Sequence, residues 1–289
     1  MYNKSGQLLK LGSSLLKKVN ISRPQHESRL ILSKEMTKDI NEIYSNIYLN
    51  VSENKKNSFL KKIYQRLEGK PISRILGYRE FFSRKFLINK FTLDPRPESE
   101  FLVELIIKQI KKIKKKKIRI LELGTGSGCL LITILLESKK LGKRISSVGC
   151  DICDKSILLA KKNIKVYGLK KEISLIKSNW FSCINEKFDI IFSNPPYIKS
   201  KEINDLSKDV KNYDPLISLD GGKDGIECFR EISKKINSYL FDNGYFFTEI
   251  GINQEHILKY LFFRENMKKT WVYKDFQGIK RNIVFFKEK

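Results

Sequence analysis

Apolar residues recur at helical spacing through the first seventy residues of the chain. Steps of three and four separate four of them near the start: Leu8, Leu11, Leu15 and Val19. No stretch here alternates between apolar and polar residues as a half-buried strand does, so the pattern predicts helices between about residues 5 and 68. Gly69, Lys70 and Pro71 then interrupt it, because glycine and proline mark turns.

Short apolar runs replace the helical pattern between residues 75 and 92. Phe81-Phe82 and Phe86–Ile88 are too short for helices and predict a hairpin that leads into a larger domain. After Glu98 the helical spacing returns. It predicts a helix with one apolar face: Phe101, Leu102, Leu105, Ile106 and Ile110.

Strands and helices then alternate to the end of the chain. The runs that predict strands are Ile118–Leu123, Ser146–Cys150, Ile173–Ile176, Phe188–Ser193, Tyr245–Ile250, Thr270–Tyr273 and Asn282–Phe286. The last two are too close together for a crossover helix, so they predict an antiparallel hairpin. The whole pattern predicts an α/β fold with a mostly parallel sheet and one antiparallel strand near its edge. Ligands of such folds bind at the carboxyl ends of the strands.

A glycine-rich turn joins the first of these strands to the apolar stretch Cys129–Leu136, which predicts a helix. The turn reads Gly124-Thr125-Gly126-Ser127-Gly128. Glycines let a ligand approach the backbone closely, and the amino terminus of a helix lies behind them. The spacing G-x-G-x-G differs from the dinucleotide motif G-x-G-x-x-G, and the Lys-Ser/Thr pair of a P-loop is missing. The turn therefore favours a nucleotide-type pocket and disfavours NAD and ATP.

Asp151 ends the second predicted strand and is the candidate ribose ligand, since a carboxylate can accept both protons of a ribose diol. The alternative is a cap for the helix that starts near Lys155, because Asp is common before helices. The third strand leads to Ser178–Phe181, in which Trp180 either flanks an adenine ring or belongs to the core.

Asn194-Pro195-Pro196-Tyr197 directly follows the strand Phe188–Ser193. The two prolines end the strand and place Asn194 at its carboxyl end. The Asn194 side-chain oxygen and a proline-adjacent carbonyl can accept the hydrogens of a planar amide or amino nitrogen, and the tyrosine ring can cover its face. Asn-Pro by itself is also an ordinary turn signal.

These motifs together resemble those of class I S-adenosylmethionine-dependent methyltransferases that act on amide and amino nitrogens. More narrowly, the chain resembles the PrmC/HemK family, the peptide chain release factor glutamine methyltransferases, which methylate the glutamine of a Gly-Gly-Gln motif. The segments that carry the resemblance are Glu122–Gly128, Asp151, Ser178–Phe181, Asn194–Tyr197, Ile75–Phe81, Pro95–Glu100, Asp214–Leu216 and Leu219–Gly225. It covers nearly the whole chain and is weakest in the first seventy residues.

The resemblance implies the fold, the cofactor and the site. We expect a class I methyltransferase Rossmann-like sheet with a small N-terminal helical domain: residues 1–72 for substrate recognition, a hairpin linker at 73–95 and the methyltransferase domain at 96–289. The implied ligands of S-adenosyl-L-methionine are Gly124, Thr125, Gly126, Ser127, Gly128, Asp151, Trp180 and Asn194. The implied catalytic residues are Asn194, Pro195 and Tyr197, and these three with Pro196 form the implied substrate site.

Alignment is what the implied reaction needs most, because a neutral amide nitrogen attacks a positively charged donor and charge disperses. No histidine or lysine base is required. If the Asn194 side-chain oxygen and the Pro195 carbonyl accept both amide hydrogens, the nitrogen becomes a better nucleophile. We expect Tyr197 to pack on the amide plane and exclude water.

Two residues depart from the family pattern. Asn179 stands where an acid is often seen, which weakens a contact near the adenine amine. Asp94 precedes Pro95 where an apolar residue is more usual, so we expect a wetter wall there.

Two other functions stay open at the level of sequence. An adenine-amino DNA or RNA methyltransferase uses the same tetrapeptide on a flipped base. It needs a target-reading domain with aromatic and basic residues, whereas the first seventy residues predict a small helical module suited to a protein surface. A nonenzymatic cofactor-binding protein is the third candidate, and intact Asp151 and Asn194 disfavour it.

The chain is strongly basic, with 57 Lys and Arg against 32 Asp and Glu and a formal net charge of +25. Such a field, with its run Lys114–Lys117, would speed association with ribosomes or nucleic acid. The chain is also rich in Ile and Asn, and we favour a bias of composition as the explanation. We expect release factors as partners, no stable nucleic-acid partner and a monomer.

Five cysteines are scattered through the predicted core elements: Cys129, Cys150, Cys153, Cys183 and Cys228. Cys150-x-x-Cys153 has the spacing of a redox or zinc half-site, but there is no second pair and His26 and His256 are remote, so we expect no metal. No apolar stretch is long enough to span a membrane, and Met1–Lys4 begins no signal peptide. We therefore expect a cytoplasmic protein.

Overall fold

The computed structural model describes residues 4–275 and 277–289; Met1–Asn3, on which part of the signal-peptide expectation falls, lie outside them. Packing divides the chain into two units. The helical unit contains the residues up to Tyr78 together with Ser207–Tyr213, and the larger unit contains Arg79–Leu206 and Asp214–Lys289.

The helical unit confirms the helices predicted between residues 5 and 68. Its elements are α1 (Ser5–Lys18), α2 (Pro24–Met36), α3 (Ile40–Ser45), α4 (Glu53–Leu67) and α5 (Ile72–Leu76), and the short helix α9 (Lys208–Tyr213) falls in the same unit. Buried aliphatic and aromatic side chains, among them Leu8, Leu16, Ile31 and Phe59, form one apolar cluster between α1, α2 and α4.

Of the four apolar residues that indicated a helix here, Leu8 is buried and Leu11 and Leu15 are partly buried, whereas Val19 follows the end of α1 and is 44 % exposed. Gly12 is buried as well, and a Cβ added there would lie 2.8 Å from the Phe59 ring and 2.7 Å from Ser28 Oγ. The missing side chain lets α1 approach its neighbours closely.

The larger unit contains the predicted sheet, whose strand order is β5-β4-β3-β6-β7-β9-β8. The strands are β3 (Lys117–Leu123), β4 (Arg144–Asp151), β5 (Ile173–Lys177), β6 (Phe188–Ser193), β7 (Leu240–Glu249), β8 (Lys269–Lys274) and β9 (Lys280–Phe286). β9 pairs antiparallel with both β7 and β8, and the other pairs are parallel. The prediction of one antiparallel strand near the edge is therefore confirmed.

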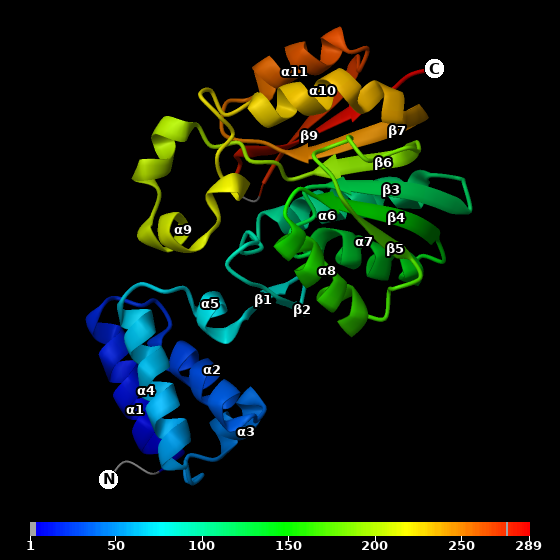
Figure 1. The fold of residues 1–289 in the computed structure, drawn as a ribbon. Helices are drawn as coiled ribbons and strands as arrows, with labels where there is room; N and C mark the ends of the chain where they lie inside the picture. Colours follow the sequence, from blue (N-terminus) through cyan, green and yellow to red (C-terminus); the bar gives the residue numbers. More distant parts are fainter. Residues whose placement is uncertain (1–3, 276) are drawn as a thin grey trace. The chain divides into compact units, whose positions relative to one another are not determined.

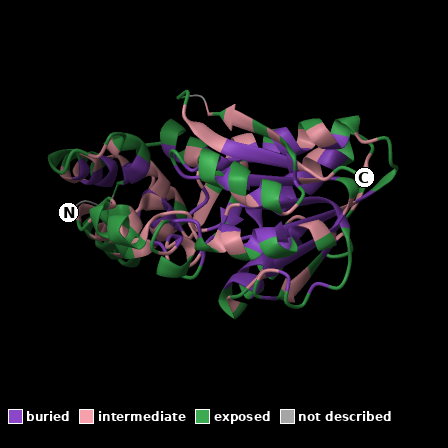
Figure 2. Cartoon of the chain, turned by 90° about the horizontal axis from the view of Figure 1, so that it is seen from above, coloured by how far each residue is buried: buried purple, intermediate pink, exposed green. Residues whose placement is uncertain are grey.

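Helices cover both faces of this sheet (Figure 1). On one face lie α6 (Ser99–Lys112), α7 (Cys129–Lys140) and α8 (Asp154–Val166), and on the other α10 (Glu227–Tyr239) and α11 (Glu255–Arg264). The strands alternate between two apolar clusters: Ile120 and Ile190 belong to the first, and Leu121 and Ile191 to the second. Figure 2 shows buried residues concentrated in the sheet, so the loops at its carboxyl edge are supported by a packed core.

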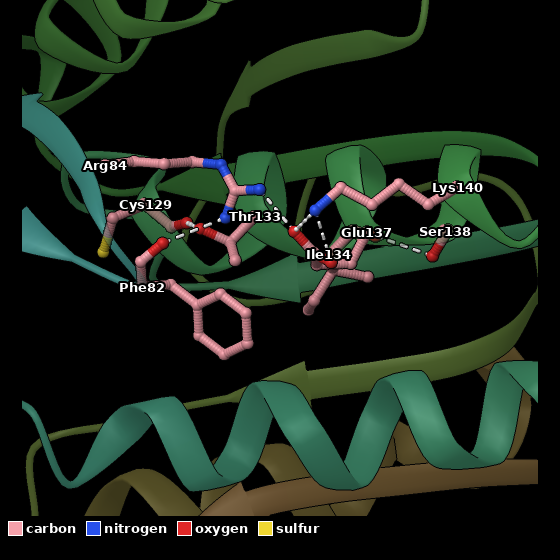
Figure 3. Close-up of polar contacts among 8 residues, drawn as sticks. All are labelled: Phe82, Arg84, Cys129, Thr133, Ile134, Glu137, Ser138 and Lys140. Atoms are coloured by element: carbon pink, nitrogen blue, oxygen red, sulfur yellow. Dashed lines mark hydrogen bonds and ion pairs between the residues drawn. The ribbon is translucent and has the colours of Figure 1, made fainter.

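A two-stranded sheet, β1 (Tyr78–Phe81) and β2 (Arg84–Leu87), occupies the segment for which a hairpin was predicted. Its turn residues Phe82 and Ser83 both have positive φ, which suits a tight hairpin. In Figure 3, Arg84 bonds to the Phe82 carbonyl and pairs with Glu137 on α7. This ion pair fixes the hairpin to the sheet-covering helix.

Candidate active site

A cavity of about 790 Å³ lies at the carboxyl ends of β3, β4 and β6, where the sequence predicts ligand binding. Every residue that lines it belongs to the larger unit. Its wall combines residues from several segments, namely Phe91–Leu93, Pro95, Arg96, Gly124–Ser127, Asp151–Cys153 and Asn194–Pro196, together with parts of 178–180 and 216–228.

The glycine turn lines part of the cavity, and at its glycines the backbone carries no side chain. Gly124, Gly126 and Gly128 all have positive φ, a region that side chains strongly disfavour. A Cβ added at Gly126 would meet nothing within 4 Å. The backbone N–H groups of Gly124 and Thr125 both donate to the Cys150 carbonyl at 2.9 Å, which ties the turn to the end of β4.

Asp151 joins the glycine turn to the segment after β4. Its Oδ2 accepts the Gly126 N–H and its Oδ1 accepts the Cys153 N–H, both at 2.8 Å. Burial raises the pKa of this carboxyl. The residue that caps α8 is Cys153, so the alternative interpretation of Asp151 as the helix cap is wrong.

Glu122, at the end of β3, is a cavity residue that the sequence indicated only through the resemblance. Its side chain is buried, and the Thr125 hydroxyl donates to it. Burial raises the pKa of Glu122 to about 8, and the charge of nearby Asp151 acts in the same direction. The cavity thus holds two carboxyl groups whose charged forms burial disfavours.

Trp180 and Asn179 both line the cavity after β5. The Trp180 ring also packs against the second apolar cluster, so it belongs to the core and to the cavity wall at once. Asn179 is exposed.

The tetrapeptide contributes Asn194, Pro195 and Pro196 to the cavity. Tyr197 is not among the lining residues. Its ring packs against the second apolar cluster, and its hydroxyl donates to Glu249 Oε1 at 2.9 Å. The structure places this ring behind the cavity wall rather than in it, which differs from the expectation that it packs on a bound amide.

The Asn194 side chain is held by two residues that sequence reasoning did not single out. Its Nδ2 donates to Ser99 Oγ at 3.0 Å and to Glu249 Oε2 at 2.9 Å. No described residue donates a hydrogen bond to the Asn194 Oδ1 or to the Pro195 carbonyl, so both oxygens stay available as acceptors. The signal that could have indicated Glu249 is an acid at the carboxyl end of a buried strand.

The Asp-Gly-Gly segment packs directly on the tetrapeptide. The Gly221 N–H donates to the Ile198 carbonyl at 2.8 Å, and a Cβ at Gly221 would lie 2.8 Å from both the Pro196 carbonyl oxygen and the Tyr197 Cα. Gln254 Nε2 donates to the carbonyls of Tyr197 and Gly225, each at 3.0 Å. These contacts fix the path of the tetrapeptide backbone.

Two further segments of the resemblance, Pro95–Glu100 and Asp214–Leu216, contact each other. Arg96 lines the cavity and pairs with Asp214, whose Oδ1 accepts the Asp94 N–H at 3.1 Å. Asp94, the unusual residue here, is buried and lies 3.9 Å from Arg79. The charge of Arg79 therefore offsets part of the cost of burying this carboxylate.

Within residues 4–275 and 277–289, no group of three or more His, Cys, Asp and Glu side chains is placed to hold a metal ion. No helix in the described ranges is both long and apolar enough to cross a membrane.

Comparison with known proteins gives matches over both units. Residues 7–77 match the PrmC N-terminal domain, and residues 97–210 match the methyltransferase small domain. The chain is 36 % identical to the release factor glutamine methyltransferase of Buchnera aphidicola (subsp. Schizaphis graminum), over 96 % of this chain and 98 % of that protein.

Two further matches are a longer protein and a structure with lower sequence identity. The bifunctional methyltransferase of Rickettsia conorii is 34 % identical over 96 % of this chain, which spans only 57 % of that relative. A methyltransferase structure from Pyrococcus furiosus shares the fold, with a TM-score of 0.53 and 16 % identity, over 79 % of this chain and 99 % of that one.

Proposed function

Because the chain belongs to the release factor glutamine methyltransferase family, we propose that it transfers a methyl group from S-adenosyl-L-methionine to a release factor. The acceptor is the side-chain amide nitrogen of the glutamine in the Gly-Gly-Gln motif. The observation that carries this proposal is the Asn194 side chain, which lines the cavity with its N–H groups already bonded and its oxygen available.

The cavity residues fit the cofactor. S-adenosyl-L-methionine supplies an electrophilic methyl group on a positively charged sulfur. The open space beside Gly126 accommodates a ligand against the backbone, Asp151 offers its carboxylate to a ribose, and Trp180 offers an aromatic face to an adenine. A cation in the same cavity would stabilise the ionised forms of Glu122 and Asp151. We assign Gly124–Gly128, Asp151, Trp180 and Asn194 to cofactor binding on these grounds.

The tetrapeptide then holds the substrate amide. The Asn194 Oδ1 and the Pro195 carbonyl accept its two hydrogens, which fixes the nitrogen in line with the methyl group and raises its nucleophilicity. Such alignment can lower the barrier by roughly 7 kcal/mol or more. Pro196 forms part of the wall, and Tyr197 acts from behind it by holding the tetrapeptide to Glu249.

We assign recognition of the release factor to the N-terminal helices, with domain boundaries at 72/73 and 95/96. The match of residues 7–77 to the PrmC N-terminal domain supports this assignment. We also propose that the protein works in the cytoplasm, where release factors act, and that it works as a monomer.

The test is methyl transfer in a purified system. The protein is incubated with isotopically labelled S-adenosylmethionine and either a release factor or nucleic acid, and the label is located by mass spectrometry. We expect the label on the motif glutamine. Label on adenine, or on another release factor residue, contradicts the proposal.

A further inference from the structure

We infer that Glu249 is a positioning residue that sets which end of the Asn194 amide faces the substrate. Through Asn194 it makes the site select a glutamine amide over a glutamate carboxylate. This inference rests on the proposed function and deepens it.

Glu249 receives three hydrogen bonds from groups around the cavity. It ends β7 and is 2 % exposed. Its Oε2 accepts from Ser99 Oγ at 2.6 Å and from Asn194 Nδ2 at 2.9 Å, and its Oε1 accepts from the Tyr197 hydroxyl at 2.9 Å. Strand register creates this arrangement: Ser193 of β6 lies opposite Thr248 of β7, so the next residues, Asn194 and Glu249, are neighbours.

An asparagine amide has two ends of nearly equal shape, one a donor and the other an acceptor. An ionised Glu249 only accepts. The Ser99 hydroxyl gives its single proton to Glu249, so it presents lone pairs to Asn194 as well. Glu249 and Ser99 therefore both need the Nδ2 end of the Asn194 amide as a donor. If the amide were rotated, its Oδ1 would lie against Glu249 Oε2 and Ser99 Oγ, which are both acceptors.

The hydrogen bonds of Nδ2 determine which end of the Asn194 amide faces the cavity. With Nδ2 bonded behind, Oδ1 is the end that meets the substrate, and it accepts a hydrogen from an amide nitrogen. A carboxylate in the same place would set oxygen against oxygen. If the Asn194 amide were rotated, its Nδ2 would face the substrate instead. This donor would repel the N–H groups of a glutamine amide and attract a carboxylate.

The charges near Glu249 come from two sides. Burial raises the pKa of Glu249, the hydrogen bonds from Ser99 and Tyr197 and the charge of Arg281 on β9 lower it, and Glu98 adds to the rise. The net direction is upward, so the acceptor role stands on the geometry, in which Ser99, Asn194 and Tyr197 all donate to Glu249.

Two variants of Glu249 distinguish the effect of its side-chain shape from the effect of its hydrogen-bond acceptance. Glu249→Gln keeps the shape and one oxygen, whereas Glu249→Met keeps the approximate length and has no oxygen. We expect kcat for release factor methylation to fall about tenfold to a hundredfold in Glu249→Met, the scale of loss for a displaced reacting group, and less in Glu249→Gln. The dissociation constant of S-adenosylmethionine, measured by calorimetry, should change little in either.

A competition assay reports on the amide orientation itself. The competitor is the release factor with glutamate in place of the motif glutamine. We expect it to inhibit the wild-type protein weakly and the Glu249→Met variant more strongly, relative to each protein's KM for the glutamine substrate. If the variant had only lost packing, its binding of the glutamine substrate and its binding of the glutamate competitor would weaken together.

Ser99→Ala and Ser138→Ala form a matched control pair. Both serines are buried and donate one hydrogen bond, but Ser138 bonds to the Ile134 carbonyl within α7 (Figure 3). We expect a lower kcat and weaker glutamine preference only for Ser99→Ala.

Two results would overturn the inference. One is a Glu249→Met variant with wild-type kcat and wild-type preference for glutamine. The other is a variant that loses kcat, cofactor affinity and melting temperature together, with its glutamine preference intact. Failure of the proposed function is distinct, since the wild-type protein itself would then transfer no methyl group to glutamine.

Discussion

Asn194 is the residue on which the chemistry depends most directly. Its Oδ1 is the acceptor that we assign to the substrate amide, so Asn194→Ala should lower kcat by about a hundredfold through loss of alignment. Its other contacts are to Ser99 and Glu249, so cofactor affinity should suffer less. Single-turnover methyl transfer and calorimetry measure the two effects, and unchanged turnover would contradict the assignment.

Glu122 should make stability depend on pH. Burial raises the pKa of Glu122 from 4.5 to about 8 in the folded protein. Between these values the folded state holds a proton that the unfolded state has released, so the free energy of unfolding should fall as pH rises through this window. Urea denaturation without cofactor, at pH 5, 6, 7 and 8, measures the fall.

Glu122→Gln is the control for this pH dependence. Its amide oxygen can still accept from the Thr125 hydroxyl, but the side chain does not titrate. The fall in stability should therefore become shallower in the variant. The same slope in both proteins would mean that Glu122 is ionised in the folded state.

At the scale of elements, the site depends on loops packed against one another at the carboxyl edge of the sheet. Gly221 has no room for a Cβ, since the nearest atoms belong to the backbone of Pro196 and Tyr197. Gly221→Ala should displace the tetrapeptide and lower kcat by about tenfold to a hundredfold.

Gly142→Ala serves as the comparison, because a Cβ at Gly142 meets nothing within 4 Å. Its positive φ predicts a stability cost of about 1–2 kcal/mol and no loss of kcat. Equal kcat in the two variants would show that the close packing at Gly221 is not needed for the reaction.

At the scale of the whole molecule, the two units should respond to different ligands. All residues lining the cavity belong to the larger unit. Cofactor alone should therefore slow amide hydrogen exchange around Gly124–Gly128 and Asp151–Cys153 and leave α1–α4 unchanged. A release factor should slow exchange in the helical unit, if that unit recognises it.

Hydrogen exchange followed by mass spectrometry distinguishes these cases. Protection of α1–α4 by cofactor alone would mean that the cofactor acts beyond the larger unit. A release factor that protects no peptide of the helical unit would contradict its assignment to recognition.

Much of the fold was predictable because it rests on local patterns. Apolar periodicity located the strands and helices, and the short connection before Asn282 predicted the antiparallel hairpin that β8 and β9 form. The close packing of α1 was not predictable, because it depends on contact at Gly12 with Phe59, a residue far along the chain.

The sequence by itself determined the features that need only neighbouring residues: the glycine turn, the acid at the end of β4, and a tetrapeptide that ends a strand at Asn194. Only the tertiary structure decided how they work together. Glu249 is 55 residues from Asn194 along the chain, and the two meet because β6 and β7 are adjacent and parallel in a particular register. Strand order and register depend on packing over the whole sheet, so the orientation of the Asn194 amide has no local signature.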